Sequence, residues 1–434
     1  KINQLKNQTD QVLITIPSLK RNDLRRLVTS IRKNNLPVYK VPSIDEITSG
    51  KQQLTKVQSI NFESLLGRDP VPGIKDLSES AIQDKVVLIT GAGGSIGSEL
   101  CRQVLNLNPS KLIILEIHEP SLYFCYEELF KTFSDRCDLI PILGNSENEI
   151  LVNQIFNNNK IDLVFHCAAY KHVPIVEANP LQGLKNNIYS TLCICQASIR
   201  AGVEQVVLIS SDKAVRPTNV MGVSKRISEL ICQGYAKDGK FKSFSNEVTS
   251  FPIFSMVRFG NVLGSSGSVI PLFQKQIESG GPITLTHEKV NRYFMTIKEA
   301  SELVIQSASL AKGGEVFLLD MGEPVLIKDL ASQMIELSGL TVKSESNPVG
   351  DIKIVSTGLR PGEKMYEELL IDSESTITEH PLIFRANESF ISIETLLTEL
   401  KDLKIAIDKG DKENTFKIIK KLVPEWDIYF DKSN

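Results

Sequence analysis

Three adjacent residues that can exchange protons, Ser211, Asp212 and Lys213, follow an apolar run over residues 206–209. A hydroxyl, a carboxyl and an amine can each accept or donate a proton at a substrate. The run before them predicts a strand over 206–210, which would place the three side chains where that strand ends. Adjacent Asp and Lys residues after a strand are also the ordinary pattern of a surface ion pair. We favour a catalytic role for these residues over a surface ion pair, because a glycine-rich turn is expected at the same edge of the sheet.

A second pair follows closely along the chain. Met221 and Lys225 are four residues apart, so they share one face of an expected helix. A Lys at this place can hydrogen-bond the ribose of a nicotinamide cofactor.

The glycine-rich turn is Thr90-Gly91-Ala92-Gly93-Gly94-Ser95-Ile96-Gly97, which follows the apolar run 86–89 and precedes a helical pattern. Strand, turn and helix in this order predict a dinucleotide site with the pyrophosphate at the helix N-terminus. An ordinary tight turn is the alternative. The next expected strand ends at Glu116, where an acid would bind an adenosine ribose. Glu116 favours NAD over NADP, because a carboxylate repels the extra phosphate; a solvated strand end competes with this interpretation.

Alternating patterns predict the elements that position these residues. We expect strands at 86–90, 112–117, 139–143, 163–168, 206–210 and 254–258 with helices between them. Repeated βαβ units predict an α/β fold with a doubly wound parallel sheet of the Rossmann type. Before it, a strand, helix and strand at 11–16, 20–34 and 37–41 predict a truncated α/β segment. After it, leucine spacing predicts two C-terminal helices, with Gly410 as a left-handed cap and Asp411 opening the second.

These patterns predict five regions along the chain. They are a truncated α/β segment at 1–56, a linker at 57–80, an NAD-binding Rossmann domain at 81–258, a mainly substrate-binding region at 259–389 with 290–320 returning to the Rossmann domain, and C-terminal helices at 390–434. Ligands bind beyond the carboxyl ends of parallel strands, so we expect the irregular region after 259 to form a lid over a substrate.

Composition excludes some classes of protein. The 434 residues are 41% hydrophobic and 23% charged, enough apolar sequence for one large or several smaller domains. A net charge of −3, with no basic tract near the glycine turn, argues against nucleic acid as a partner. The seven cysteines are scattered and odd in number, so we expect reduced core residues and no metal site.

The sequence up to residue 56 is basic, with a balance of +7. Either a solvated helix face or a surface near anionic lipid head groups explains this charge, and we favour the second. The chain starts without Met and without a signal peptide, so we expect a trimmed fragment. No apolar run is long enough to span a bilayer, so we expect the fragment to be soluble.

Six segments together resemble one family. They are 90–97, 168–174, 211–215, 258–262, 292–296 and 358–364. They are similar to the extended short-chain dehydrogenase/reductases, specifically the nucleotide-sugar 4,6-dehydratases of bacterial surface-glycan synthesis, in their long capsule-type form. The resemblance extends over roughly residues 10–385. It implies a UDP-sugar substrate, an oligomer of identical chains and, in the full-length protein, attachment through an upstream segment to the cytoplasmic side of the bacterial inner membrane.

The resemblance implies catalytic roles. Lys213 would remove the proton on carbon 5 and Asp212 would protonate the departing 6-hydroxyl. Ser211, helped by Lys225, would contact the 4-hydroxyl in place of the usual catalytic Tyr, which is Met221 here. Burial beside Lys225 and a cationic cofactor would keep Lys213 neutral for part of the time, and a dry pocket would favour protonated Asp212.

The resemblance also implies binding residues. With the glycine turn, the cofactor set is Thr90, Gly91, Gly93, Gly94, Ser95, Ile96, Gly97, Glu116, Asn145, Ser146, Ala168, Ala169 and Lys225. The substrate set is Lys171, Asn261, Arg292, Arg360 and Glu363. Arg suits a diphosphate because its planar fork donates two bonds at once. Asn145 stands where the family more often has Asp near the adenine.

We therefore expect an NAD-dependent UDP-N-acetylglucosamine 4,6-dehydratase that keeps the carbon 5 configuration, since Met221 goes with that subgroup. Two alternatives stay open. One is a nucleotide-sugar 4-epimerase, in which the hydride returns to carbon 4; Asp212 and Lys213 argue against it, because an epimerase has no departing hydroxyl to protonate. The other is a catalytically silent NAD-binding regulatory protein, which Met221 alone would permit.

Overall fold

The computed structural model describes residues 9–16, 19, 21–32, 36, 38–40, 58–59, 73–237, 251–368, 375–386 and 388–426. Contacts divide the chain into two units. The larger unit comprises 72–260, 297–321 and 360–434, and the smaller comprises 1–71, 261–296 and 322–359. The domain limits that we predict at residues 56, 80, 258 and 389 stay predictions.

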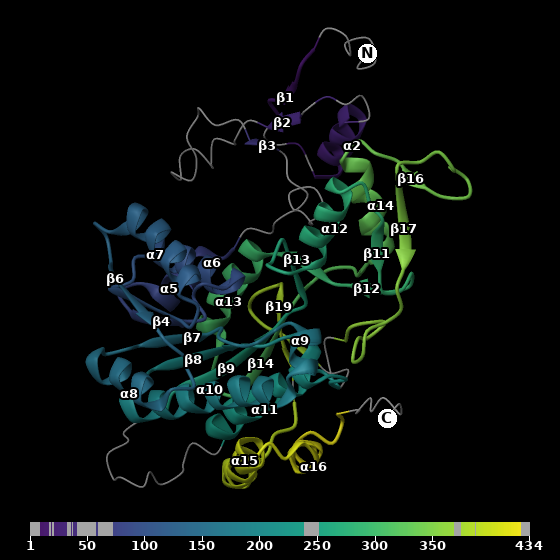
Figure 1. The fold of residues 1–434 in the computed structure, drawn as a ribbon. Helices are drawn as coiled ribbons and strands as arrows, with labels where there is room; N and C mark the ends of the chain where they lie inside the picture. The colour runs from purple at the N-terminus through teal and green to yellow at the C-terminus, as the bar shows by residue number, and fades with distance from the viewer. Residues whose placement is uncertain are drawn as a thin grey trace. The chain divides into compact units, whose positions relative to one another are not determined.

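A nine-stranded sheet forms the centre of the larger unit (Figure 1). In spatial order its strands are β18 (Ser375–Ile377), β19 (Ile383–Ala386), β14 (Glu315–Leu319), β9 (Ile253–Arg258), β8 (Gln205–Ile209), β7 (Leu163–His166), β4 (Val86–Thr90), β5 (Lys111–Glu116) and β6 (Asp138–Leu143). The strands from β14 to β6 pair in parallel, whereas β19 and β18 pair antiparallel at one edge. The predicted doubly wound α/β fold and its six strands are confirmed, within a few residues at the strand ends.

Helices cover both faces of this sheet, which explains why its central strands are continuous runs of Val, Ile and Leu. One face carries α5 (Lys75–Ile82), α6 (Ser95–Leu105), α7 (Glu119–Phe133) and α13 (Ile297–Leu310) (Figure 1). The other carries α8 (Glu149–Asn158), α10 (Pro180–Ala201) and α11 (Val220–Lys237), with the short α9 (Val173–Ala178) before α10. A single 3₁₀ turn, η1 (Asp212–Ala214), follows β8.

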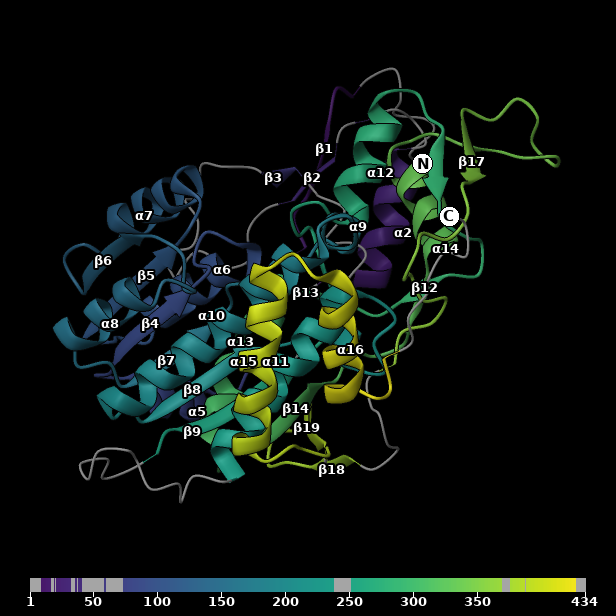
Figure 2. The ribbon, with the colours of Figure 1, turned by 60° about the horizontal axis from the view of Figure 1, so that its bottom comes forward.

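Two helices near the C-terminus form an outer layer over α10 and α11 (Figure 2). They are α15 (Ile393–Asp408) and α16 (Lys412–Leu422). Gly410 between them has a φ of 73°, and the Asp411 side chain accepts a hydrogen bond from the Asn414 N–H at 3.0 Å. The predicted left-handed cap and helix start are therefore confirmed.

The smaller unit is built from short strands and three helices in its described residues. Its strands are β1 (Val12–Ile14), β2 (Val38–Lys40), β3 (Gln58–Ser59), β10 (Asn261–Leu263), β11 (Ile283–Leu285), β12 (Asn291–Arg292), β13 (Phe294–Thr296), β15 (Val325–Leu326), β16 (Val342–Lys343) and β17 (Ile352–Ser356). Its helices are α2 (Arg21–Arg32), α12 (Val269–Glu278) and α14 (Ile327–Leu337). β1 precedes α2 in the chain, β2 follows it, and the two strands pair in parallel, which confirms the predicted βαβ segment.

Seven free cysteines are present, and five of them are buried. Cys195 and Cys232 lie with their sulfur atoms 3.8 Å apart between α10 and α11. Within the described residues, no group of three or more His, Cys, Asp or Glu side chains could hold a metal ion. Over the same residues, no helix combines the length and apolar character needed to cross a membrane.

Candidate active site

Two glycines of the turn between β4 and α6 lie so close to other backbone atoms that a side chain would not fit. Gly91 has a φ of +67°, and a Cβ on it would lie 2.8 Å from the backbone nitrogen of Ala168. A Cβ on Gly97 would lie 2.1 Å from the carbonyl oxygen of Gly91. A side chain at either position would force the turn open, so this geometry requires glycine. The turn leads into α6 through Gly94, which has no side chain to cap the first helical turn. This is the cradle that a pyrophosphate needs.

Glu116 lies at the end of β5 and belongs to this turn. It is 8% exposed, and its Oε2 accepts a hydrogen bond from the Gly93 N–H at 2.9 Å. Its Oε1 accepts from the N–H groups of Ile117 and His118 at 2.9 and 3.0 Å. Glu116 is therefore not a solvated strand end. A Cβ on Gly93 would crowd the Glu116 side chain at 3.1 Å, so the two positions depend on each other.

The ends of β4 and β7 are joined beneath the turn by a buried histidine. His166 Nδ1 and Thr90 Oγ1 are 2.7 Å apart, and Thr90 Oγ1 accepts from the Ala168 N–H at 3.3 Å. His166 Nε2 lies 3.2 Å from Thr191 Oγ1. Burial, and then the charge of Lys225, lowers the pKa of His166 to about 3. His166 is therefore neutral and ties two strand ends together.

Lys225 lies on α11 with its amine turned toward the end of β8. Its Nζ donates to the carbonyl oxygen of Ile209 at 2.8 Å, and the residue is 7% exposed. Burial lowers the pKa of Lys225 to about 8. Met221, one turn earlier, is 3% exposed and belongs to the hydrophobic core. A thioether in this position packs but transfers no proton.

Ser211, Asp212 and Lys213 lie directly after β8, as the sequence predicts. The Ser211 hydroxyl donates to Asp212 Oδ1 at 2.8 Å, and Lys213 Nζ donates to the same oxygen at 2.9 Å. The Asp212 side chain is 1% exposed and that of Lys213 is 21% exposed, so the pair is not a solvated surface ion pair. Asp212 Oδ2 is buried and has no hydrogen-bond partner in the described part of the chain. One buried carboxylate thus accepts from both a hydroxyl and an amine.

Glu367 is a charged neighbour of this group that the sequence reasoning missed. Its Oε1 lies 3.4 Å from Lys213 Nζ, and its side chain is 3% exposed. The sequence signal is weak, because Glu367 and Glu368 are adjacent and of the same type. Glu368 instead pairs with Arg216 at 2.8 Å near the surface.

The segment that carries Glu367, residues 360–368, is held against the loop after β8. The Gly362 carbonyl accepts from Asn219 Nδ2 at 3.0 Å, and Lys364 Nζ donates to the Val215 carbonyl at 2.8 Å. Gly362 has a φ of +72°, and a Cβ there would lie 2.7 Å from the Asn219 side chain. Glycine at this position lets the segment lie close to the loop.

Asn187 is a second residue that the sequence reasoning missed. It lies on α10, is 1% exposed, and holds the loop after β7 in place by hydrogen bonds. Its Oδ1 accepts from the Tyr170 N–H at 2.7 Å, and its Nδ2 donates to the Tyr170 carbonyl at 3.0 Å and to Ser224 Oγ at 2.8 Å. No motif in the sequence marks it, because its partners lie on two other elements.

The remaining predicted cofactor residues, together with Lys171 of the predicted substrate set, lie in the loops after β6 and β7. Asn145 Oδ1 accepts from the backbone N–H two residues further on, at 2.9 Å, and Ser146 is buried. Ala168 and Ala169 are half-buried beside the glycine turn, and Lys171 is exposed in the same loop. The roles of these five residues stay predictions.

The predicted substrate residues divide between the two units. Arg360 and Glu363 belong to the larger unit, where the Arg360 N–H donates to Glu363 Oε2 at 3.2 Å. Asn261 and Arg292 belong to the smaller unit, where the Asn261 N–H donates to the Tyr293 carbonyl at 3.1 Å. Asn261 on β10 is paired with Phe294 on β13, whereas Arg292 lies on β12 and is paired with Val325 on β15.

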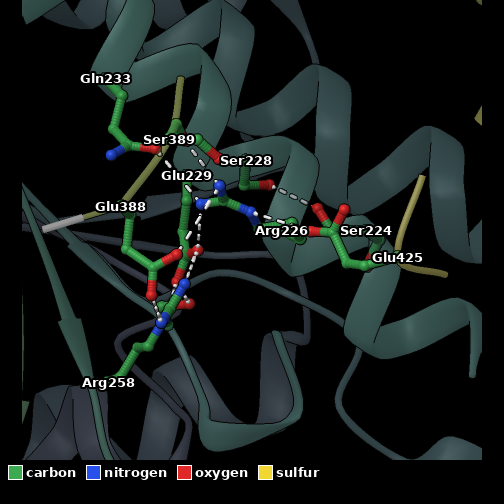
Figure 3. A network of polar contacts seen from close by, with 10 residues as sticks. Ser224, Arg226, Ser228, Glu229, Gln233, Arg258, Glu388, Ser389 and Glu425 are labelled. Atoms are coloured by element: carbon green, nitrogen blue, oxygen red, sulfur yellow. Dashed lines mark hydrogen bonds and ion pairs between the residues drawn. The ribbon is translucent and has the colours of Figure 1, made fainter. Parts of the chain in front are cut away.

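A buried ionic network lies beside the end of β8 (Figure 3). Arg258, at the end of β9, donates to both carboxylate oxygens of Glu229 at 2.7 and 2.6 Å and to Glu388 at 2.6 Å. Arg226 donates to Glu229 at 3.1 Å. Ser210, the residue before Ser211, donates to Glu229 at 2.6 Å. The strand end that precedes Ser211, Asp212 and Lys213 is therefore anchored to α11 and to the segment before α15.

The parallel sheet, glycine turn and buried lysine define an extended short-chain dehydrogenase/reductase. The family model described as "Polysaccharide biosynthesis protein" matches residues 87–388, and the chain belongs to this family.

Three curated relatives are informative. The chain is 45% identical to the capsular polysaccharide biosynthesis protein CapD of Staphylococcus aureus over 84% of this chain and 58% of CapD. It is 43% identical to the probable polysaccharide biosynthesis protein EpsC of Bacillus subtilis over 85% of this chain and 59% of EpsC. The chain thus spans under three fifths of the length of these two relatives. It is 29% identical to a UDP-N-acetylglucosamine 4,6-dehydratase (inverting) of Campylobacter jejuni over 68% of this chain and 80% of that enzyme.

Solved structures share the fold. Pen from Bacillus thuringiensis is 34% identical with a TM-score of 0.61, covering 74% of this chain and 99% of Pen. DesIV, a dTDP-glucose 4,6-dehydratase from Streptomyces venezuelae solved with NAD bound, is 20% identical with a TM-score of 0.53, covering 65% of this chain and 88% of DesIV.

Proposed function

We propose that this chain is a UDP-N-acetylglucosamine 4,6-dehydratase that uses NAD, keeps the configuration at carbon 5 and serves surface polysaccharide synthesis. The observation that carries the proposal is the buried Asp212 Oδ1, which accepts from both Ser211 and Lys213. The family and the dehydratase name of the Campylobacter relative support the dehydration, although that relative is named as inverting. Met221 supports the retaining subgroup, as the family resemblance implies.

The glycine turn fits a dinucleotide, because Gly91 and Gly97 leave no room for a Cβ and α6 begins directly after it. The turn would hold the pyrophosphate, Glu116 the adenosine ribose and Lys225 the nicotinamide ribose. Glu116 favours NAD over NADP, because its carboxylate lies at the turn itself. NAD supplies a hydride acceptor for carbon 4 and, once reduced, a hydride donor for carbon 6. NAD in the DesIV structure supports this choice of cofactor.

The hydrogen bonds of the site suggest a route for the protons. Ser211 takes the proton of the 4-hydroxyl and passes its own proton to Asp212 Oδ1 across 2.8 Å. Asp212 then gives a proton to the departing 6-hydroxyl, which leaves as water. Lys213 takes the proton from carbon 5 and later returns one there. Each residue ends the cycle in its starting protonation state, so the route balances.

Substrate anchoring forms a further part of the proposal. Asn261, Arg292 and Arg360 would bind the uridine diphosphate, with Lys171 and Glu363 nearby, as the family resemblance implies. Two guanidinium groups suit a diphosphate because each donates two parallel hydrogen bonds. Assembly into an oligomer of identical chains and membrane attachment of the full-length protein are proposals from the same resemblance.

Incubation with UDP-N-acetylglucosamine and NAD in deuterated water tests the function. We expect a 4-keto product that has lost water and carries deuterium at carbon 5, detected by mass spectrometry and NMR. A mass-neutral isomer without label at carbon 5 would show a 4-epimerase instead. NAD binding with unchanged sugar would show a silent regulatory protein.

A further inference from the structure

The amine of Lys213 lies between two buried carboxylates. Asp212 Oδ1 is 2.9 Å from Nζ, and Glu367 Oε1 is 3.4 Å from it. The side chains of the two acids are 1% and 3% exposed, respectively. Solvent therefore screens these interactions little, and both carboxylates favour the ammonium form of Lys213.

The two carboxylates are not equivalent. Asp212 is the neighbour of Lys213 in the chain and also accepts from Ser211. Glu367 comes from the segment 360–368, which contacts the loop after β8 through Gly362 and Lys364. Glu367 therefore meets the amine from a second element, and the amine is directed by both acids together.

Other charged groups around the loop are engaged elsewhere. On α11, which packs against η1, Lys225 donates to the Ile209 carbonyl, and Arg226 pairs with Glu229. On the segment 360–368, Lys364 pairs with Glu368 at 3.1 Å. In the described part of the chain, the carboxylates of Asp212 and Glu367 both contact Lys213 Nζ.

We propose that Glu367 is a positioning residue for the dehydration, acting through Lys213. Its carboxylate holds the amine in place and, by its charge, sets the pH at which Lys213 becomes neutral and able to take the carbon 5 proton. The inference rests on the proposed function, because it assigns Lys213 the role of base. Glu367 touches neither sugar nor cofactor in this proposal.

Glu367→Gln tests this inference, because glutamine keeps the size of the side chain and removes its charge. We expect two effects on dehydration measured from pH 6 to pH 10. The maximal kcat falls by about tenfold or more, since the amine loses the Glu367 carboxylate that helps to orient it. The acid limb of the kcat profile moves to lower pH by about one unit, since loss of a nearby anion makes the neutral amine easier to form. KM for the sugar nucleotide stays unchanged.

Two further variants separate positioning from folding. Glu367→Asp keeps the charge, so we expect the acid limb at its wild-type pH and a kcat between those of wild type and Glu367→Gln. Glu368→Gln, the matched neighbour, is expected to leave the pH profile unchanged, because Glu368 pairs with Arg216 and Lys364. Should Glu367→Gln fail to fold, Glu367→Asp alone decides, because a wild-type kcat in that variant overturns the proposal.

The outcomes distinguish this inference from the proposed function. A wild-type protein that releases no 4-keto product refutes the function itself. A wild-type protein that dehydrates the sugar, with a Glu367→Gln variant whose acid limb has not moved, refutes only the role of Glu367. In Glu367→Gln, a lower kcat without a shift of the acid limb would show a merely structural residue and would also overturn the inference.

Discussion

Arg258 and Glu229 form a two-bond ion pair, at 2.7 and 2.6 Å, in which neither side chain has any exposed surface. Burial alone would raise the pKa of Glu229, but Arg258 and Arg226 outweigh it and the pKa is lowered. Glu229 also accepts from Ser210, so this pair fixes the backbone just before Ser211. The strand end before Ser211 thus depends on a buried ion pair outside the proposed catalytic residues.

Arg258→Met should destabilise the larger unit strongly. The substitution leaves Glu229 and Glu388 buried with fewer positive partners, and breaking such a pair typically costs about 3–5 kcal/mol. Urea unfolding followed by circular dichroism measures the change. Lys75→Met, which removes an exposed pair with Glu79, serves as the control and should have little effect. Equal stability of wild type and Arg258→Met would contradict the prediction.

Lys225→Met should change how stability depends on pH. Lys225 titrates at about 8 in the folded protein and near 10.4 in the unfolded chain. Below pH 8 both states carry the charge, and the cost of burying it is present in full, so we expect the variant to be the more stable protein at pH 7. Between these values the unfolded chain binds more protons. Between pH 8 and pH 10.4, the free energy of unfolding of wild type should therefore rise relative to that of the variant by up to about 1.4 kcal/mol per pH unit.

Unfolding of the cofactor-free proteins in urea at pH 7, 8, 9 and 10 measures this difference. If the difference in the free energy of unfolding between wild type and Lys225→Met stayed constant across the series, the buried amine would have the pKa of an ordinary lysine, and the prediction would be wrong.

Lys213→Ala and Asp212→Asn should each keep cofactor binding and abolish turnover. Removal of a positioned acid or base typically costs a factor of about 10²–10⁴ in rate. Calorimetric titration with NAD and product detection by NMR measure the two properties separately. Full activity in either purified variant would discard the assigned roles.

Met221→Tyr should not raise the rate, because in the proposed mechanism Ser211 fills the place of the usual tyrosine. The buried position of Met221 in the core also leaves little room for a phenol. Ser211→Ala, in contrast, should lower turnover by breaking the link between the 4-hydroxyl and Asp212. Steady-state kcat for the two variants checks both statements. A large gain for Met221→Tyr would show that Ser211 is misassigned.

Gly97→Ala should weaken NAD binding and destabilise the turn. The added Cβ would lie 2.1 Å from the Gly91 carbonyl oxygen, so the start of α6 must move away from β4. Ser98→Ala, the next residue on the same helix, serves as the control because its hydroxyl makes one long bond of 3.4 Å within the helix. NAD titration should show a loss of about tenfold or more for Gly97→Ala and little for Ser98→Ala.

The sequence by itself determined the elements whose causes are local. A buried apolar strand followed by Gly91 and Gly97 specifies the tight turn between β4 and α6, since only glycine fits those close approaches. The end of β8 placed Ser211, Asp212 and Lys213 together because they are adjacent in the chain. Gly410 and Asp411 fixed the boundary between α15 and α16 in the same way.

Only the tertiary structure decided which distant charges meet. Glu367 reaches Lys213, and Glu388 reaches Arg258, because the chain returns to the loop after β8 and to the end of β9 from segments far along the sequence. Hydrophobic periodicity reports whether a position is buried but does not name its partner. An ion pair between such segments depends on how the strands and loops pack, so adjacent residues such as Glu367 and Glu368 acquire different surroundings that no local pattern distinguishes.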